Sequence, residues 1–234
     1  MAETADIAVL DGEDAGTTPW EFTSIVEEAG NGFDLDAAAA LHGDYGYKVS
    51  FGGSNDAAYG KEPMVSVDPC YIRCYFSFPV ADYPFSTEAT LKKFRLFRAV
   101  DASSNVLFEL WFRANQSAAQ IYQIGYGDNT TSYAITLPEA VDIPLGMSHF
   151  VDVGYKKGLD DSGQVEFRLD GNTFYTKAIT TSKNSLELRI GSTYAEANPA
   201  NGEYFYLDDL LVSTTGPIGG YSEAAGTKLV MIRK

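Results

Sequence analysis

Histidine, cysteine and positive charge are all scarce in this chain of 234 residues. It has 2 His, 2 Cys and 17 Lys plus Arg against 32 Asp plus Glu, so its formal net charge is −15. An acidic chain repels phosphate backbones, so we expect no nucleic-acid partner. The sequence also lacks a run of 18 apolar residues, which predicts that no segment spans a membrane.

The two cysteines, Cys70 and Cys74, are too few and too close in sequence for a disulfide framework or a zinc site. On one strand their Cα atoms would lie about 13 Å apart at ~3.3 Å per residue, well beyond the ~7 Å limit for a disulfide. The sequence therefore predicts two buried thiols; the alternative is a bond from one of them to another chain.

The first residues, MAETADIAVLDGEDAG, lack the basic and apolar regions of a signal peptide. We nevertheless expect a virion or cell-surface (extracellular) location, because the motifs described below are those of displayed modules.

Alternating apolar and polar residues are abundant, and 13% of the residues are aromatic. The alternation runs through CYIRCYFSFP (70–79), VLFELWFR (106–113), VEFRLDG (165–171) and YFYLDDLLV (204–212). FRLFRAV alternates irregularly, so its two faces cannot be assigned. Strands of this kind separated by turn residues and few helical patterns predict an all-β, antiparallel β-sandwich or jelly roll.

Several segments, taken in order, carry a family resemblance. They include LDGEDAGTTPW (10–20), LHGDYGYKVSF (41–51) and YFYLDDLLVSTTGPIG (204–219). Together they resemble the concanavalin A-like (laminin G-like) jelly-roll superfamily of lectins and glucanases, and more narrowly its lectin-like modules of bacterial or phage origin. The resemblance implies a jelly-roll domain over residues 1–218, followed by a C-terminal arm at 219–234.

Catalytic motifs of that superfamily are missing. Its glycosidases place two carboxylates in an E-x-D-x-x-E run, and its polysaccharide lyases use Arg, Gln-x-His and Tyr-x-x-Tyr motifs; neither pattern is found here. Glu109 stands as a single carboxylate, whereas glycoside hydrolysis needs a pair. We therefore predict that the chain is not an enzyme.

An acidic pair, Asp208-Asp209, interrupts an apolar strand, and buried carboxylates must be paired or coordinated. The resemblance implies a structural Ca²⁺ held by this pair together with Asp11 and Glu13 from the first segment. In the alternative interpretation, Asp208 caps a neighbouring turn or pairs with an Arg or Lys, and no metal binds.

The polar faces of two strands supply the candidate binding residues. These are Tyr71, Arg73, Tyr75, Glu109, Trp111 and Arg113. If both strands share one surface, aromatic rings could stack on sugars while Arg and Glu bind hydroxyls or carboxylates. The same residue types are typical of protein interfaces and of cross-strand ladders that only stabilise a sheet, so these two alternatives stay open.

From these patterns we predict a non-catalytic, lectin-like module that recognises a glycan or polysaccharide on a concave face around Tyr71, Arg73, Tyr75 and Trp111. The alternative is a structural building block of a large assembly, such as a phage capsid-decoration or tail protein, with a homo-oligomer or other assembly subunits as partners. A polysaccharide hydrolase or lyase is the third hypothesis.

Overall fold

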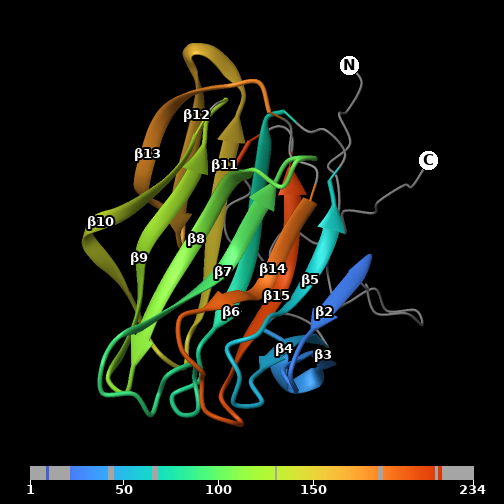
Figure 1. The fold of residues 1–234 in the computed structure, drawn as a ribbon, viewed down its shortest axis with the longest axis vertical. Coiled ribbons are helices and arrows are strands. Elements are labelled where there is room, and N and C mark those ends of the chain that lie inside the picture. The colour runs from blue at the N-terminus through green and yellow to red at the C-terminus, as the bar shows by residue number, and fades with distance from the viewer. Residues whose placement is uncertain are drawn as a thin grey trace, which may run out of the picture.

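Two antiparallel sheets stacked one behind the other form a β-sandwich in the computed structural model (Figure 1). The structure describes residues 9–10, 22–41, 45–64, 68–129, 131–183, 187–213 and 216–217. The predicted antiparallel jelly-roll sandwich is thus confirmed. The proposed C-terminal arm, 219–234, lies outside the described residues, and the domain boundary at 218 stays a prediction.

Sheet A has eight strands and sheet B has seven. In spatial order, sheet A consists of β13 (Asn172–Thr181), β12 (Gly158–Leu169), β11 (Ser148–Lys156), β6 (Cys70–Ser77), β15 (Tyr204–Ser213), β4 (Gly46–Ser50) and β3 (Gly32–Asp36), and β1 (Val9–Leu10) also pairs with β15. Sheet B consists of β10 (Ser132–Ile143), β9 (Ala118–Gly127), β8 (Val106–Asn115), β7 (Lys92–Val100), β14 (Glu187–Ala195), β5 (Ala58–Pro63) and β2 (Ser24–Glu27). Among the described residues the single helical element is the short 3-10 turn η1 (Ala37–Ala39), and no helix there is long and apolar enough to cross a membrane.

Phenylalanine rings from both sheets meet in the core between them. Phe76 of β6 lies 5.3 Å from Phe112 of β8 between ring centroids, and Phe94 of β7 lies 6.0 Å from Phe205 of β15. All four rings are almost fully buried, as the alternation of CYIRCYFSFP predicts for Phe76 and that of VLFELWFR predicts for Phe112. Apolar burial between sheets is the main driving force for such a fold, at about 25 cal/mol per Å².

Cys70 and Cys74 also face this core, with exposed fractions of 0% and 1%. Both are free thiols, which confirms the prediction of buried thiols. Burial is the main cause that raises the pKa of Cys70 to about 12, and the nearby Asp68 carboxylate adds to the shift. Burial also holds the pKa of Cys74 well above its usual range.

The outer face of sheet B carries one continuous cross-strand row. Tyr194 pairs with Arg95, Arg95 with Trp111, Trp111 with Gln123 and Gln123 with Thr136. Residues paired across antiparallel strands point to the same face of the sheet, so these side chains are neighbours.

A belt of β-bulges follows this row and lies in four of its five strands. We define the bulge belt as Leu96 in β7, Tyr122 in β9, residues 137–140 in β10 and residues 191–193 in β14, where the strand register shifts. A bulge bends its strand, increases the local twist and re-aims the adjoining side chains. Sheet B is therefore bent along one line, and that line passes beside Arg95 and Trp111.

Candidate functional site

The six candidate binding residues do not share one surface. Tyr71, Arg73 and Tyr75 lie in β6 of sheet A, whereas Glu109, Trp111 and Arg113 lie in β8 of sheet B. Both groups face away from the core between the sheets, so they lie on opposite outer faces of the sandwich. The prediction of one concave face around Tyr71, Arg73, Tyr75 and Trp111 is therefore wrong.

The sheet A group is closely packed. Arg73 donates from Nη2 to Asp209 Oδ2 at 2.7 Å, and its guanidinium lies 5.1 Å from the centroid of the Tyr75 ring. Tyr75 in turn lies 5.3 Å from the ring of Phe150. The exposed fractions of Arg73 and Tyr75 are only 3% and 6%. This geometry is that of a stabilising ladder, with little surface left for a ligand.

The acidic pair is held by the protein itself. Asp208 Oδ2 accepts a hydrogen bond from the backbone N–H of Leu41 at 2.7 Å, while Asp209 forms the ion pair with Arg73. Among the described residues no group of three potential metal ligands is present. Asp11 and Glu13, the other two candidates, lie outside the described residues. The calcium site therefore stays a prediction.

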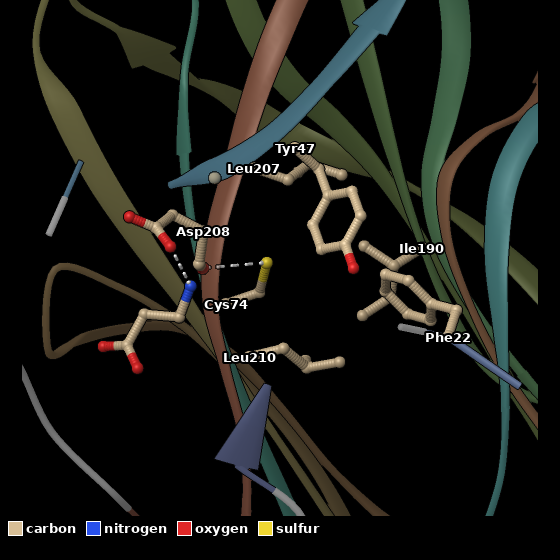
Figure 2. Close-up of a pocket in the computed structure, with 9 residues that line it drawn as sticks. Phe22, Tyr47, Cys74, Ile190, Leu207, Asp208 and Leu210 are labelled. Atoms are coloured by element: carbon tan, nitrogen blue, oxygen red, sulfur yellow. Dashed lines mark hydrogen bonds between the residues drawn. The ribbon is translucent and has the colours of Figure 1, made fainter. Parts of the chain in front are cut away.

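Beside this pair, a small cavity opens between the two sheets (Figure 2). Phe22, Tyr47, Cys74 and Leu210 point into it, whereas the Asp208 carboxylate points away. Its volume is about 10 Å³, which is room for about one water molecule. A sugar does not fit there, whereas the outer face of sheet B carries a cluster of polar and aromatic side chains.

Glu109 is the centre of the polar cluster on that face. Its Oε2 accepts a hydrogen bond from Arg95 Nη1 at 3.0 Å, and its Oε1 accepts one from Trp111 Nε1 at 2.8 Å. Arg98 Nε lies 3.9 Å from the same Oε2 atom. The guanidinium of Arg95 also covers the Trp111 ring, 5.1 Å from its centroid. One carboxylate thus fixes two arginines and one indole.

Gly125 makes room for this carboxylate. It pairs with Glu109 across β8 and β9, and a Cβ atom at Gly125 would lie 2.4 Å from Glu109 Cγ. Any larger residue would force the Glu109 side chain out of its position. The glycine is therefore required by the close approach of a side chain rather than by a turn.

A row of cations extends from Glu109 across the neighbouring strands of sheet B. Arg98 of β7 pairs with Arg189 of β14, which pairs with Lys61 of β5; we call these three the Arg98 row. Burial lowers the pKa of the Arg98 guanidinium, and the positive charge of Arg95 adds to the shift. Within the described part of the chain, Arg98 Nε has no hydrogen-bond partner. An anion placed here would relieve the repulsion between these arginines.

On the other side of the bulge belt lies a second, shorter row. Lys93 of β7 pairs with Arg113 of β8, and we call these two the Arg113 row. Arg113 donates from Nε to Gln120 Oε1 at 2.8 Å, and its guanidinium lies 5.6 Å from the centroid of the Tyr122 ring. The Lys93 ammonium lies 3.9 Å from the Glu196 carboxylate.

Two tyrosines complete the face, and the sequence analysis identified neither. Tyr194 is 44% exposed and meets the Trp111 ring edge-on at 5.5 Å. Tyr122 is the bulge residue of β9; its hydroxyl is buried and has no hydrogen-bond partner among the described residues. Burial raises the pKa of Tyr122 to about 12, and the Glu196 carboxylate contributes. The sequence does carry one sign of the bulge at Tyr122. Ile121 and Ile124 are three positions apart and both enter the core, whereas a regular strand places every second residue on the same face.

Comparisons with known proteins give the fold but no family. No protein-family model matches the chain, and no curated protein matches it in sequence. Among solved structures, the endo-β-1,4-glucuronan lyase of the fungus Trichoderma reesei aligns over 90% of this chain and 96% of its own, with a TM-score of 0.62 and 14% identity. The cellulose-induced protein Cip1 aligns over 92% and 100%, with a TM-score of 0.61 and 14% identity. The alginate lyase Aly36B aligns over 79% and 88%, with a TM-score of 0.55 and 12% identity.

These neighbours contradict the prediction that the chain is not an enzyme, because the solved structures that share its fold include polysaccharide lyases. That prediction relied on a missing carboxylate pair and missing short motifs. Elimination requires no carboxylate pair, and its catalytic residues need not be close together in the sequence. It needs a cation beside a sugar carboxylate and a group that carries a proton, and these can come from different strands.

Proposed function

We propose that this protein is a polysaccharide lyase that binds a uronic-acid polymer on the outer face of sheet B and cleaves it by β-elimination. The observation that carries the proposal is the arginine cluster on this face: Arg95 and Arg98 meet the carboxylate of Glu109, and Arg189 pairs with Arg98 across the strands. The neighbours support it, since glucuronan and alginate, after which two of these lyases are named, are polymers of uronic acids.

In such an elimination, a base takes the proton from the carbon next to the sugar carboxylate. The electron pair forms a carbon–carbon double bond, the bond to the glycosidic oxygen breaks, and that oxygen takes up a proton. Neither water nor an oxidant is consumed. A cation at the carboxylate stabilises the negative charge that develops there. We assign this role to Arg98, because its Nε atom has no hydrogen-bond partner among the described residues, whereas Arg95 donates to Glu109 and Arg189 donates to Glu187.

We assign the proton transfer to Tyr194. It is the exposed phenol beside the bulge belt, and it pairs across the strands with Arg95. His149, the histidine in the described part of the chain, lies in β11 of sheet A, where its Nδ1 is 2.8 Å from Asp170 Oδ2. It cannot reach this face. The Tyr122 hydroxyl is covered, so it does not contact the polymer directly.

The test uses ultraviolet absorbance, because each elimination creates an unsaturated, absorbing sugar end. The native protein is incubated with polyglucuronate, alginate and polygalacturonate. We expect product from at least one polymer, and loss of about 100-fold or more in rate for Tyr194→Phe, the scale of general acid–base catalysis. Tyr45→Phe is the matched control, because Tyr45 is 43% exposed, like Tyr194, but lies just before β4 of sheet A.

Absence of unsaturated product with all three polymers would overturn the lyase proposal. Product formation at full rate by Tyr194→Phe would overturn the role of Tyr194 while leaving the reaction class intact. We further propose an extracellular place of action, since polymers of this kind lie outside the cell.

A further inference from the structure

Two rows of cations flank the bulge belt on the outer face of sheet B. The Arg98 row crosses β5, β14 and β7, and the Arg113 row crosses β7 and β8. Neighbouring strands are about 4.8 Å apart, so each row advances by that distance per strand. Glu109, which pairs with Arg98, and Arg113 are four residues apart in β8, or about 13 Å at ~3.3 Å per residue.

Among the described residues, the two rows and Arg95 supply six positive side chains. The carboxylates in ion pairs with them are those of Glu109, Glu187 and Glu196, and Asp142 adds a fourth carboxylate through its hydrogen bond from Gln120. The whole chain, by contrast, has a net charge of −15. A local excess of positive charge on an acidic protein is a site for an anionic ligand.

An aromatic surface lies between the rows. Trp111 and Tyr194 pack edge to face, and both adjoin the bulge belt. Aromatic rings present flat apolar surface on which the C–H face of a sugar can stack. The order across this face is therefore a row of cations, a stripe in which Arg95 lies between Tyr194 and Trp111, and a second row of cations, and each stripe runs perpendicular to the strands.

We propose that an acidic polysaccharide lies across the strands along the bulge belt, and that the carboxylates of consecutive sugar units bind alternately to the Arg98 row and the Arg113 row. In an extended 1,4-linked polymer each unit is turned by about half a revolution from the one before, so neighbouring carboxylates point to opposite sides. Two rows separated by an aromatic stripe match that alternation. The proposal rests on the proposed function for the polymer class, and it adds the direction of the polymer and the two rows that bind it.

Binding measured separately from cleavage tests this arrangement. Affinity electrophoresis in gels with polyglucuronate would compare Arg189→Gln in the Arg98 row, Arg113→Gln in the Arg113 row and the double variant. Lys156→Gln is the matched control, because Lys156 is an exposed cation in β11 of sheet A. The Tyr194→Phe background keeps the polymer intact during the run, and Lys61→Gln replaces Arg189→Gln if that variant does not fold.

We expect each row variant to weaken binding about tenfold, the double variant about 100-fold, and the control by less than twofold. Loss of affinity from one row alone would overturn the alternation, and loss from neither would overturn the site. Wild-type protein that binds through both rows but releases no unsaturated product would refute the lyase and leave this inference standing. Product formation by the wild type, with unchanged affinity in every row variant, would refute this inference and leave the lyase proposal standing.

Discussion

At the scale of single residues, Glu109 sets the charge balance of the outer face of sheet B. Its carboxylate is only 10% exposed, and the Arg95 side chain bound to it is 13% exposed. A buried ion pair contributes little relative to an apolar pair of the same shape. Removing one partner is nevertheless costly, because the other charge is left buried and unpaired.

We predict that Glu109→Gln lowers the free energy of unfolding by about 3 kcal/mol, the low end of the cost of breaking a buried pair. Urea denaturation followed by circular dichroism measures it. The control is Glu166→Gln, which breaks the more exposed Glu166–Arg168 pair of sheet A and should cost under about 1 kcal/mol. Equal losses in the two variants would mean that Glu109 has no special role.

At the scale of elements, strand β9 shapes the site by two local features. Gly125 leaves room for Glu109, and the bulge at Tyr122 shifts the register against both neighbouring strands. Both features act on side chains of other strands, so their effect is on the arrangement of the face rather than on the core.

We predict that Gly125→Ala weakens binding to polyglucuronate by about tenfold, or about 1.4 kcal/mol, because the added Cβ displaces Glu109 and with it Arg95 and Trp111. Affinity electrophoresis measures the loss. Gly216→Ala is the control, since no atom lies within 4 Å of a Cβ at that position. An unchanged affinity in Gly125→Ala would show that Glu109 does not position the arginines for the ligand.

Strand alternation could be predicted from the sequence, and so could the inward faces of β6 and, from Phe108 to Phe112, of β8. The sheet to which each strand belongs could not be predicted. Alternation shows only which residues share a face of a strand, whereas strand pairing depends on residues that are distant in the chain. The irregular FRLFRAV is explained by the bulge at Leu96, which lets Leu96 and Phe97 both enter the core. Broken alternation was thus the available signal for the bulge belt. Strand register brings three further residues to the site, and the sequence alone does not give that register. They are Arg189, Lys61 and Tyr194.

At the scale of the whole molecule, three tyrosines link stability to alkaline pH. Burial is the main cause that raises the pKa of Tyr122, Tyr155 and Tyr206 to about 12 each. In the unfolded chain a tyrosine titrates near 10. The unfolded state therefore loses protons first, and the stabilising contribution is complete below about pH 10 and is lost as the pH rises towards 12.

We predict that the melting temperature falls steeply between about pH 10 and 12 and that the fall is shallower in Tyr155→Phe, which has one such group fewer. Scanning calorimetry across this range measures both slopes. At neutral pH the variant should be less stable than wild type, because the Tyr155 hydroxyl bonds Thr181 Oγ1 at 3.0 Å. Parallel slopes for the two proteins would contradict the linkage.

The uneven placement of charge also bears on how a polymer would arrive. The chain has a net charge of −15, so the protein as a whole repels a polyanion. The outer face of sheet B, in contrast, carries six cations. The proposed polymer would therefore be repelled by most of the surface and attracted to the outer face of sheet B. Added salt shortens the range of both effects. We therefore expect the association rate of the polymer to fall with ionic strength, and the packing of sugars on Trp111 to change less.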